Sequence, residues 1–343
     1  MGRKHLEEIT LLRGLAIIGV VAIHSHPPPL SLGFLGLNKL YIEELSKFSV
    51  PLFIFISGLV LTFRYTGETI VYTDFLKRRF EKILIPYLAW SGIYLLYRYL
   101  YKSETFSLFA IAKKFLIGSA YFHLYYVFLI LQFYLLFPLF LRLIQRFKNR
   151  KTALLSIAAA LNLIFIAFYE STLLIPERLP RRIFIFWIFY FILGAVIGGD
   201  LKNNKRSAAD KISYKLLIPL FAASLIYLLA PAGLPLGSKL DVFWLMKKTF
   251  FYAALFILLS YKLASESNFP THNIALKPIT SLGKYSLGIY LAHLIILEPL
   301  STIILNRNLL FILTLSIAWF FTKTVSNLPY GHLLVGKINN SDT

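Results

Sequence analysis

The first candidate site is a pair of polar residues in an apolar stretch near the N-terminus. Arg13 and His24 are eleven residues apart within Ile9–Ser25. At about 100° per residue this spacing is three helical turns plus about 20°, so both side chains project from one face, roughly 16 Å apart along the axis. An arginine is a permanent cation, and a neutral histidine accepts protons near physiological pH. The pair therefore predicts a site that binds an anion and removes a proton.

A structural role for the same pair is the alternative. Arg13 could reach the cytoplasmic interface while His24 caps the outer end of the helix. A charge placed in hydrocarbon costs about 2.5–3.5 kcal/mol on insertion scales, so such a residue needs a reason to be there. Gly14 and Gly19 would allow a neighbouring helix or a ligand to approach this helix closely. The shared face favours function.

A second cluster of basic residues precedes the third apolar stretch. Arg79 and Lys82 are three residues apart, so they point the same way on a helix. Arginine offers a planar fork to a phosphate, and lysine offers a point charge. The cluster suits a cytoplasmic, nucleotide-like ligand with several phosphates. It equally suits a basic anchor at the cytoplasmic side of the membrane, and the two roles are compatible.

The remaining histidines in apolar segments are His123 and His293, each of which is either a hydrogen-bonded structural group or a substrate contact. No two histidines have the spacing of metal ligands on a helix, and the chain has no cysteine, so we expect no metal site. The sequence has no Gly-x-Ser-x-Gly motif, no phosphate-binding glycine loop and no Ser-His-Asp set.

The elements that carry these residues are expected to be membrane helices. The chain is 57% hydrophobic and 15% charged, with a net charge of +20. Soluble chains carry about 25% charged residues, and the high apolar content argues against a nucleic-acid binder. About ten stretches are long enough, or nearly so, to cross a bilayer. They are Ile9–Ser25, Val50–Tyr65, Ile83–Leu100, Phe122–Leu141, Ala153–Phe168, Ile183–Ile197, Lys215–Leu229, Phe250–Leu263, Tyr285–Leu300 and Leu309–Val325.

The distribution of basic residues predicts the orientation of these helices. Basic residues collect at the N-terminus and after the second, fourth and sixth stretches, which is typical of cytoplasmic segments. The three connections contain Lys77, Arg78, Arg79 and Lys82, then Arg146, Lys148, Arg150 and Lys151, then Lys202, Lys205, Arg206 and Lys211. We therefore expect an all-α, polytopic membrane protein with both termini in the cytoplasm. Because the connections are short, residues 1–343 are expected to form a single membrane domain.

Several motifs occur in an order that resembles the acyltransferase 3 family. They are Arg13-x10-His24, Phe48–Gly58, Arg79-x-x-Lys82 before Ile85-Pro86-Tyr87, His123-Leu124-Tyr125-Tyr126, Phe191–Ala195 and Leu282–His293. The chain departs from the family pattern at three positions. Thr10 stands where an acidic residue is frequent, Lys82 where a second arginine is frequent, and Tyr125 where a tryptophan is frequent.

The resemblance implies an integral membrane O-acyltransferase of about ten helices. Its donor would be cytoplasmic acyl-CoA, with acetyl-CoA favoured. Its acceptor would be a hydroxyl of an extracytoplasmic surface polysaccharide or of a lipid-linked glycan precursor at a bacterial plasma membrane. The stretch from Gly118 to Tyr126 is most similar to members that modify cell-wall polysaccharides or exopolysaccharides.

The resemblance also implies roles for individual residues. His24 and Arg13 would be catalytic, with His24 as the general base; an acyl-histidine intermediate remains open. Arg13, Arg79 and Lys82 would bind the donor's phosphates. His123, Tyr125 and His293 are substrate or structural candidates, and no metal is implied.

Two other classes of function compete with acyl transfer. A glycan or lipid transporter would also use ten helices with buried Arg and His, although the sequence has no internal pseudo-symmetry and no paired broken helices. A scaffold or sensor without chemistry would be expected to lose Arg13 or His24, and this chain has both. The expected partners are the bilayer, acyl-CoA and the glycan, with no nucleic acid; a homodimer is an open option.

Overall fold

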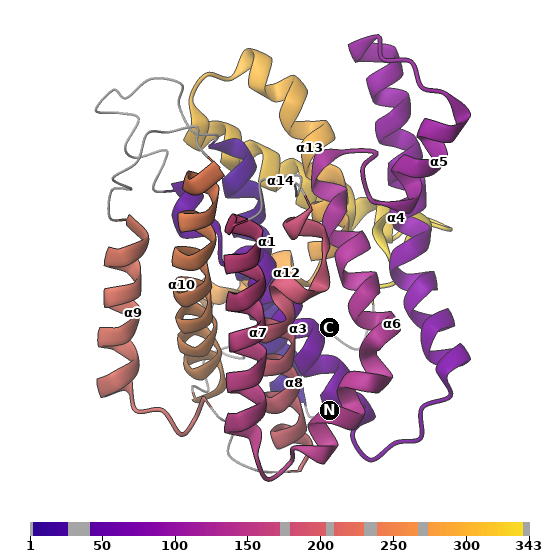
Figure 1. The fold of residues 1–343 in the computed structure, drawn as a ribbon. Helices are drawn as coiled ribbons and strands as arrows, with labels where there is room; N and C mark the ends of the chain where they lie inside the picture. The colour runs from indigo at the N-terminus through magenta and orange to yellow at the C-terminus, as the bar shows by residue number, and fades with distance from the viewer. Residues whose placement is uncertain are drawn as a thin grey trace. The chain divides into compact units, whose positions relative to one another are not determined.

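The structure is a computed structural model that describes residues 3–26, 42–171, 179–203, 209–229, 239–266 and 274–338. Within these ranges the chain is helical and contains no strand (Figure 1). Each of the ten predicted stretches falls on a helix, which confirms the all-α prediction. The helices are α1 (Arg3–Ser25), α3 (Ser49–Tyr65), α4 (Tyr72–Lys102), α5 (Leu108–Leu116), α6 (Tyr125–Arg146), α7 (Lys151–Ser171), α8 (Ile188–Lys202), α9 (Tyr214–Leu229), α10 (Lys239–Glu266), α12 (Lys277–Lys284), α13 (Ser286–Ile303), α14 (Arg307–Ser326) and α15 (His332–Val335), with short 3₁₀ turns η1 (Phe122–Leu124), η2 (Pro180–Arg182), η3 (Phe184–Trp187) and η4 (Ile274–Leu276).

Seven helical segments among the described residues are long and apolar enough to cross a membrane. They are Glu7–Ser25, Ile42–Tyr65, Phe122–Arg146, Lys151–Tyr169, Phe184–Lys202, Ser286–Ile303 and Arg307–Ser326. The predicted spans on α4, α9 and α10 are outside this set. α9 has only 16 residues, and the apolar part of α4 is rich in tyrosine and contains Arg98 and Pro86. A count of ten spans therefore stays a prediction.

Side chains and backbone conformation account for several helix ends. The Asn306 side chain accepts hydrogen bonds from the backbone N–H groups of Asn308 and Leu309, both at 3.1 Å, and so caps α14. The Ser107 hydroxyl accepts from the N–H of Ala110 at 3.2 Å at the start of α5. α4 ends at Ser103, whose φ of 52° lies in the left-handed region and cannot continue a helix.

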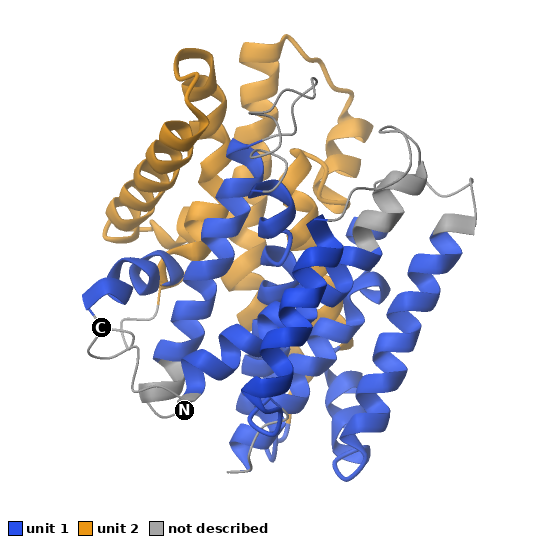
Figure 2. Ribbon diagram, turned by 90° about the vertical axis from the view of Figure 1, so that its left-hand side faces the viewer, with its two compact units in different colours: residues 1–69, 137–283 blue, residues 70–136, 284–343 orange. Residues whose placement is uncertain are grey.

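The chain separates into two compact units, each built from two distant stretches of sequence (Figure 2). Unit 1 comprises residues 1–69 and 137–283, and unit 2 comprises residues 70–136 and 284–343. Unit 1 therefore contains α1, α3, α7, α8, α9, α10 and nearly all of α12. Unit 2 contains α4, α5, α13, α14 and α15, and α6 passes from unit 2 into unit 1.

Glycines bring α3 and α8 into backbone contact in unit 1. A Cβ atom added to Gly58 would lie 2.1 Å from the carbonyl oxygen of Phe191, and one added to Gly194 would lie 1.9 Å from that of Phe55. Gly198, four residues after Gly194, makes the same kind of approach to Leu59 at 2.2 Å. Small residues at such spacing let membrane helices gain van der Waals contact that larger side chains would prevent. α9 and α10 also lie side by side in this unit (Figure 1).

Unit 2 is held together by contacts that α13 and the C-terminal segment make with α4. The Tyr94 hydroxyl donates to the carbonyl oxygen of Leu291 at 2.8 Å. The indole N–H of Trp90 donates to the carbonyl oxygen of Leu334 at 2.9 Å. These bonds give each buried aromatic side chain a partner for its polar atom, as burial requires. They anchor α4 to segments 197 and 244 residues later in the chain.

Candidate active site

α1 carries Arg13 and His24 in one element of unit 1. The helix is uninterrupted from Arg3 to Ser25, so the eleven-residue spacing places both side chains on one side of it. Both side chains are half-buried, whereas Leu12 and Ile17 are fully buried. α1 thus carries a guanidinium and an imidazole on one face, each partly accessible, with the buried side chains of Ile17 and Val20 between them (0% and 4% exposed).

Neighbouring helices occupy the space beside two glycines of α1, as the sequence predicts. A Cβ atom on Gly14 would lie 2.0 Å from the carbonyl oxygen of Ile279 in α12, and one on Gly19 would lie 2.2 Å from the Ser49 hydroxyl oxygen of α3. In the same contact, a Cβ atom on Gly283 would lie 1.8 Å from the carbonyl oxygen of Thr10. Thr10, which replaces the acidic residue frequent in the family, is therefore part of a tight helix crossing beside Arg13.

Arg79 and Lys82 lie on the first three turns of α4, because this helix begins at Tyr72, well before the predicted span. The guanidinium carbon of Arg79 is 5.8 Å from the ring centre of Phe75 and 5.9 Å from that of Tyr134. These distances are within the range of cation–π attraction. Both basic side chains are half-buried. Two aromatic rings therefore lie beside the Arg79 guanidinium.

His123 and His293 meet in the interior of unit 2. Their ring centres are 5.1 Å apart, and the residues are 2% and 0% exposed. The rings of Tyr94 and Tyr290 lie 5.1 Å and 5.2 Å from that of His123. The Nδ1 atom of His293 lies 2.7 Å from the carbonyl oxygen of Tyr290, and since a carbonyl only accepts, Nδ1 donates the hydrogen bond. The two histidines, which are far apart in the sequence, thus form one cluster lined by aromatic rings.

Tyr125 begins α6 directly after the tight turn that carries His123. Gly118 precedes this turn with a φ of 66°, and a Cβ atom there would lie 2.8 Å from the carbonyl oxygen of Leu124 and 3.1 Å from the Cα atom of Tyr125. A glycine is needed here both for the left-handed conformation and for the space. The half-buried Tyr125 is therefore positioned by the turn that begins at Gly118.

The candidate residues divide between the two units. Arg13 and His24 belong to unit 1, and Arg79, Lys82, His123, Tyr125 and His293 belong to unit 2. The structure brings together His123 with His293, and it places Arg79 and Lys82 on one helix. A path for the donor from Arg79 and Lys82 to Arg13 stays a prediction. Within the described ranges, no group of three or more His, Asp or Glu residues could hold a metal ion.

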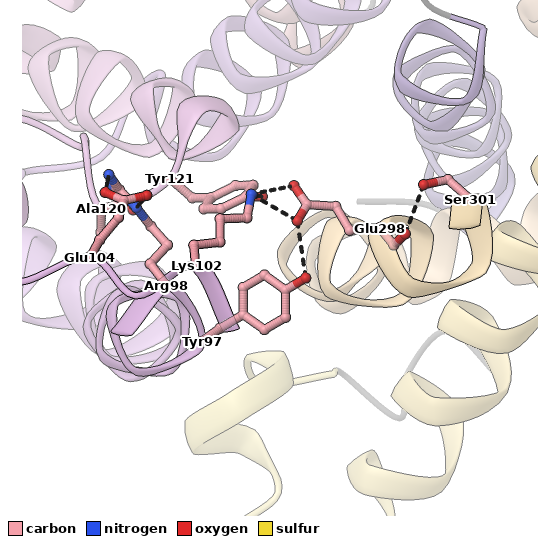
Figure 3. Close-up of polar contacts among 8 residues, drawn as sticks. All are labelled: Tyr97, Arg98, Lys102, Glu104, Ala120, Tyr121, Glu298 and Ser301. Atoms are coloured by element: carbon pink, nitrogen blue, oxygen red, sulfur yellow. Dashed lines mark hydrogen bonds and ion pairs between the residues drawn. The ribbon is translucent and has the colours of Figure 1, made fainter. Parts of the chain in front are cut away.

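Sequence reasoning missed an ionised pair at the ends of α4 and α13. Lys102 and Glu298 form a salt bridge of 2.9 Å, and the Tyr97 hydroxyl donates to the same carboxylate at 3.1 Å (Figure 3). A signal was present, because Glu298 is the one acidic residue within the apolar helix α13. An ionisable residue in such a helix is by default a candidate functional residue.

Comparisons with known proteins agree with the motifs. Residues 6–328 match the acyltransferase domain that defines the acyltransferase 3 family. A relative from Staphylococcus aureus (strain Mu50 / ATCC 700699) is named "Probable poly-beta-1,6-N-acetyl-D-glucosamine export protein"; it is 28% identical over 297 residues, covering 81% of this chain and 80% of that protein. A relative of the same name from Staphylococcus epidermidis is 27% identical over 268 residues, covering 76% of this chain and 71% of that protein.

No solved structure shows a significant match to the chain. The family assignment therefore stands on the sequence, and the match spans nearly all of it, including both units and every candidate residue. The described residues are free of strands and include seven helical segments long and apolar enough to cross a membrane, which agrees with that match. This protein is a multi-pass membrane protein that belongs to the acyltransferase 3 family.

Proposed function

We propose that the protein transfers an acyl group, with acetyl favoured, from cytoplasmic acyl-CoA to a hydroxyl of an extracytoplasmic glycan. The glycan class is a polysaccharide of N-acetylglucosamine or its lipid-linked precursor, because the relatives are named for such a polymer. The membrane would be the plasma membrane of a bacterium. The observation that carries the proposal is that Arg13 and His24 are both half-buried and share one face of α1 within the matched acyltransferase domain.

His24 acts as the general base in this proposal. Its imidazole removes the proton from the sugar hydroxyl while the hydroxyl oxygen attacks the thioester carbonyl. The carbon–sulfur bond then breaks, the acyl group stays on the sugar oxygen, and the imidazolium returns its proton to the departing thiolate. A neutral imidazole has the pKa for this exchange near physiological pH, and positioned base catalysis contributes about 10²–10⁴-fold in rate. In the variant with an acyl-histidine intermediate, the imidazole nitrogen attacks the thioester and displaces the thiolate, and the sugar hydroxyl then displaces the imidazole from the acyl carbon, giving its proton to the imidazole.

The basic residues bind the donor in this proposal. Coenzyme A carries several phosphates, which pair with guanidinium and ammonium groups. Arg79 is held between two aromatic rings, and Lys82 lies three residues later on the same helix. Lys82 stands where the family frequently has a second arginine, and its ammonium is a point charge without the planar guanidinium geometry. Arg79 therefore supplies the bidentate contact to a donor phosphate. Arg13 would contact the donor on the face of α1 that also carries His24.

The test uses the protein purified in detergent, with isotopically labelled acetyl-CoA and a β-1,6-linked N-acetylglucosamine pentamer, here called the test oligosaccharide. We expect labelled oligosaccharide to form without any vesicle. His24→Ala should reduce turnover by at least about 10²-fold, the contribution of a positioned base. Arg13→Ala should raise the donor KM or abolish turnover, because it removes a charged contact.

The matched control is His26→Ala, which removes a second imidazole from the same end of α1. His26 is buried and its Nδ1 atom lies 3.2 Å from the carbonyl oxygen of Ala22, so it is turned onto its own helix. This variant should retain turnover within a few-fold of the wild type. Normal acylation by His24→Ala would disprove the assignment of the base, and a donor KM unchanged in Arg13→Ala would disprove its role in donor binding.

Export of the glycan is a second candidate function, favoured by the names of the relatives. An exporter without acyl-transfer chemistry gives no labelled product in detergent. It would instead move the test oligosaccharide across the membrane of sealed vesicles, independently of acetyl-CoA. The two candidates are therefore separated by one pair of assays on the same purified protein.

A further inference from the structure

Unit 2 contains a polar cluster at the C-terminal ends of α4 and α13, formed by Tyr97, Lys102, Tyr121 and Glu298, which we call the Glu298 cluster (Figure 3). The Lys102 ammonium lies 2.9 Å and 3.2 Å from the two carboxylate oxygens of Glu298 and donates to the Tyr121 hydroxyl at 3.1 Å. The Tyr97 hydroxyl donates to Glu298 at 3.1 Å. Four polar groups therefore converge on one point.

The cluster is open on one side and closed on the other. The side chains of Lys102 and Glu298 are 40% and 24% exposed, whereas Tyr121 is only 5% exposed. Exposed ion pairs contribute little to folding stability, because water and salt screen them. Stability is thus a weak reason for an acidic residue in the apolar helix α13, and a ligand contact is a stronger one.

The groups of the cluster match the chemistry of a sugar. A sugar hydroxyl can donate to the Glu298 carboxylate and accept from the Lys102 ammonium or a tyrosine hydroxyl. The Tyr97 ring stacks on that of Tyr101 with centres 5.2 Å apart, and Tyr101 is 76% exposed. Tyrosine supplies an apolar ring face together with a polar tip, which suits a molecule that has both apolar and hydroxyl-bearing faces.

The cluster is continuous with the buried histidines of the same unit. The Tyr121 ring stacks on that of Tyr94 with centres 4.5 Å apart, and it lies 5.9 Å from the ring of His123. His123 in turn meets His293, which is five residues before Glu298 on α13. A ligand at the cluster would thus lie at one end of a series of contacting rings, and the other end of that series is formed by His123 and His293.

The expected topology places the cluster on the side of the acceptor. In an arrangement of ten spans with a cytoplasmic N-terminus, α4 and α13 both run outward. Their C-terminal ends, with Lys102 and Glu298, then face the extracytoplasmic side. An extracytoplasmic glycan reaches the protein from that side.

We propose that the Glu298 cluster binds a sugar unit of the glycan acceptor and so contributes to the selection of the acceptor. This proposal rests on the acyltransferase function proposed above. The Glu298 carboxylate and the Tyr97 hydroxyl oxygen accept hydrogen bonds from sugar hydroxyls, Lys102 orients the carboxylate, and the tyrosine rings contact the face of the sugar. The cluster acts on binding of the acceptor and takes no part in binding of the donor.

The test measures initial rates against the test oligosaccharide at saturating acetyl-CoA, and against acetyl-CoA at saturating oligosaccharide. Glu298→Gln should raise the acceptor KM about tenfold, the effect of losing a hydrogen bond to a charged group, and Tyr97→Phe about threefold. The donor KM should stay within twofold in both variants. The matched control is Glu104→Gln, which breaks the nearby ion pair of Arg98 with Glu104 and should leave both constants unchanged.

Equilibrium binding of the test oligosaccharide to the purified proteins separates this proposal from the proposed function. If the wild type transfers no acyl group but binds the oligosaccharide, and Glu298→Gln weakens that binding about tenfold, the enzymatic function is wrong and the site is supported. Equal binding by the wild type and Glu298→Gln, or an unchanged acceptor KM, overturns the site. If Glu298→Gln does not accumulate in the membrane, Tyr97→Phe decides by the same two measurements.

Discussion

At the scale of single residues, the surroundings of each imidazole distinguish the roles that it can take. His24 is half-buried on α1, so a substrate hydroxyl can reach it. His293 is fully buried, and its Nδ1 atom donates to the carbonyl oxygen of Tyr290 at 2.7 Å. A general base must come within hydrogen-bonding reach of the proton that it removes. We therefore keep His24 as the proposed base. We interpret His293 and His123 as structural residues of the packed interior of unit 2.

A residue-scale prediction concerns pH and the ion pair of Arg98 with Glu104. Hydrogen bonds from the Arg98 guanidinium hold the pKa of the Glu104 carboxyl below its ordinary value of 4.5. A lowered folded-state pKa means that the pair stabilises the fold fully above that ordinary value and loses its effect as the pH falls through the folded pKa. Glu104→Gln should therefore lower the Tm at pH 7 by at most about 2 °C, since the Glu104 side chain is partly open to solvent and the pair is screened there.

The measurement is thermal unfolding of the wild type and Glu104→Gln in detergent from pH 7 down to acid. The difference in Tm should shrink toward zero as the pH falls below the ordinary pKa of the carboxyl. Thr105→Ala, which changes the exposed neighbouring residue, should follow the wild type at every pH. A Tm difference that stays constant over the whole range would contradict the role of this carboxylate.

At the scale of elements, α3 and α8 are in close backbone contact within unit 1. A Cβ atom at Gly194 would lie 1.9 Å from the carbonyl oxygen of Phe55, and that neighbour is backbone, which cannot turn aside. Gly194→Ala should therefore separate the helices and destabilise the protein by about 1–3 kcal/mol, the usual effect of overpacking. The measurement is the Tm of the purified variant and its yield from membranes.

Gly92→Ala is the matched control for that prediction. Gly92 lies within α4 and has no atom within 4 Å of an added Cβ. Alanine favours a helix over glycine by about 1 kcal/mol, so this variant should be neutral or slightly more stable. A Gly194→Ala variant as stable as Gly92→Ala would mean that the contact between α3 and α8 is looser than described.

At the scale of the whole molecule, the chain alternates between two units, and its orientation in the membrane can be tested directly. The sequence contains no cysteine, so any single introduced cysteine can be labelled without background. Thr105→Cys, after α4, should react with a membrane-impermeant thiol reagent added to intact cells. Asn149→Cys, between α6 and α7, should react only after the membrane is opened, because basic residues mark that connection as cytoplasmic.

The same experiment extends to the C-terminus. Ser341→Cys should behave like Asn149→Cys if ten helices cross the membrane, since an even number returns the chain to the cytoplasm. Labelling of Ser341→Cys in intact cells would exclude an even count with a cytoplasmic N-terminus. A separate outcome tests the Glu298 cluster. If Thr105→Cys did not react in intact cells, the cluster would not face the extracytoplasmic side.

The apolar helical segments and the shared face of Arg13 and His24 could be predicted from the sequence, because both depend on local information. An apolar run of sufficient length forms a helix in a membrane, since every backbone polar group must be paired within the segment. Arg13 and His24 share a face because one helix sets their angle, so their alignment needed no knowledge of other elements. The spacing of Arg79 and Lys82 was predictable for the same reason.

Which distant side chains meet could be learned only from the packing of the helices. His123 and His293 lie on different helices, and Lys102 is 196 residues from its partner Glu298. Such contacts depend on how α4, α6 and α13 pack, which follows from the fit of many side chains at once and leaves no periodic signal in the sequence. The start of α4 at Tyr72 could not be predicted either, because the first turns of this helix are polar. The structure shows that these turns are helical and that the Arg79 guanidinium lies near the rings of Phe75 and Tyr134.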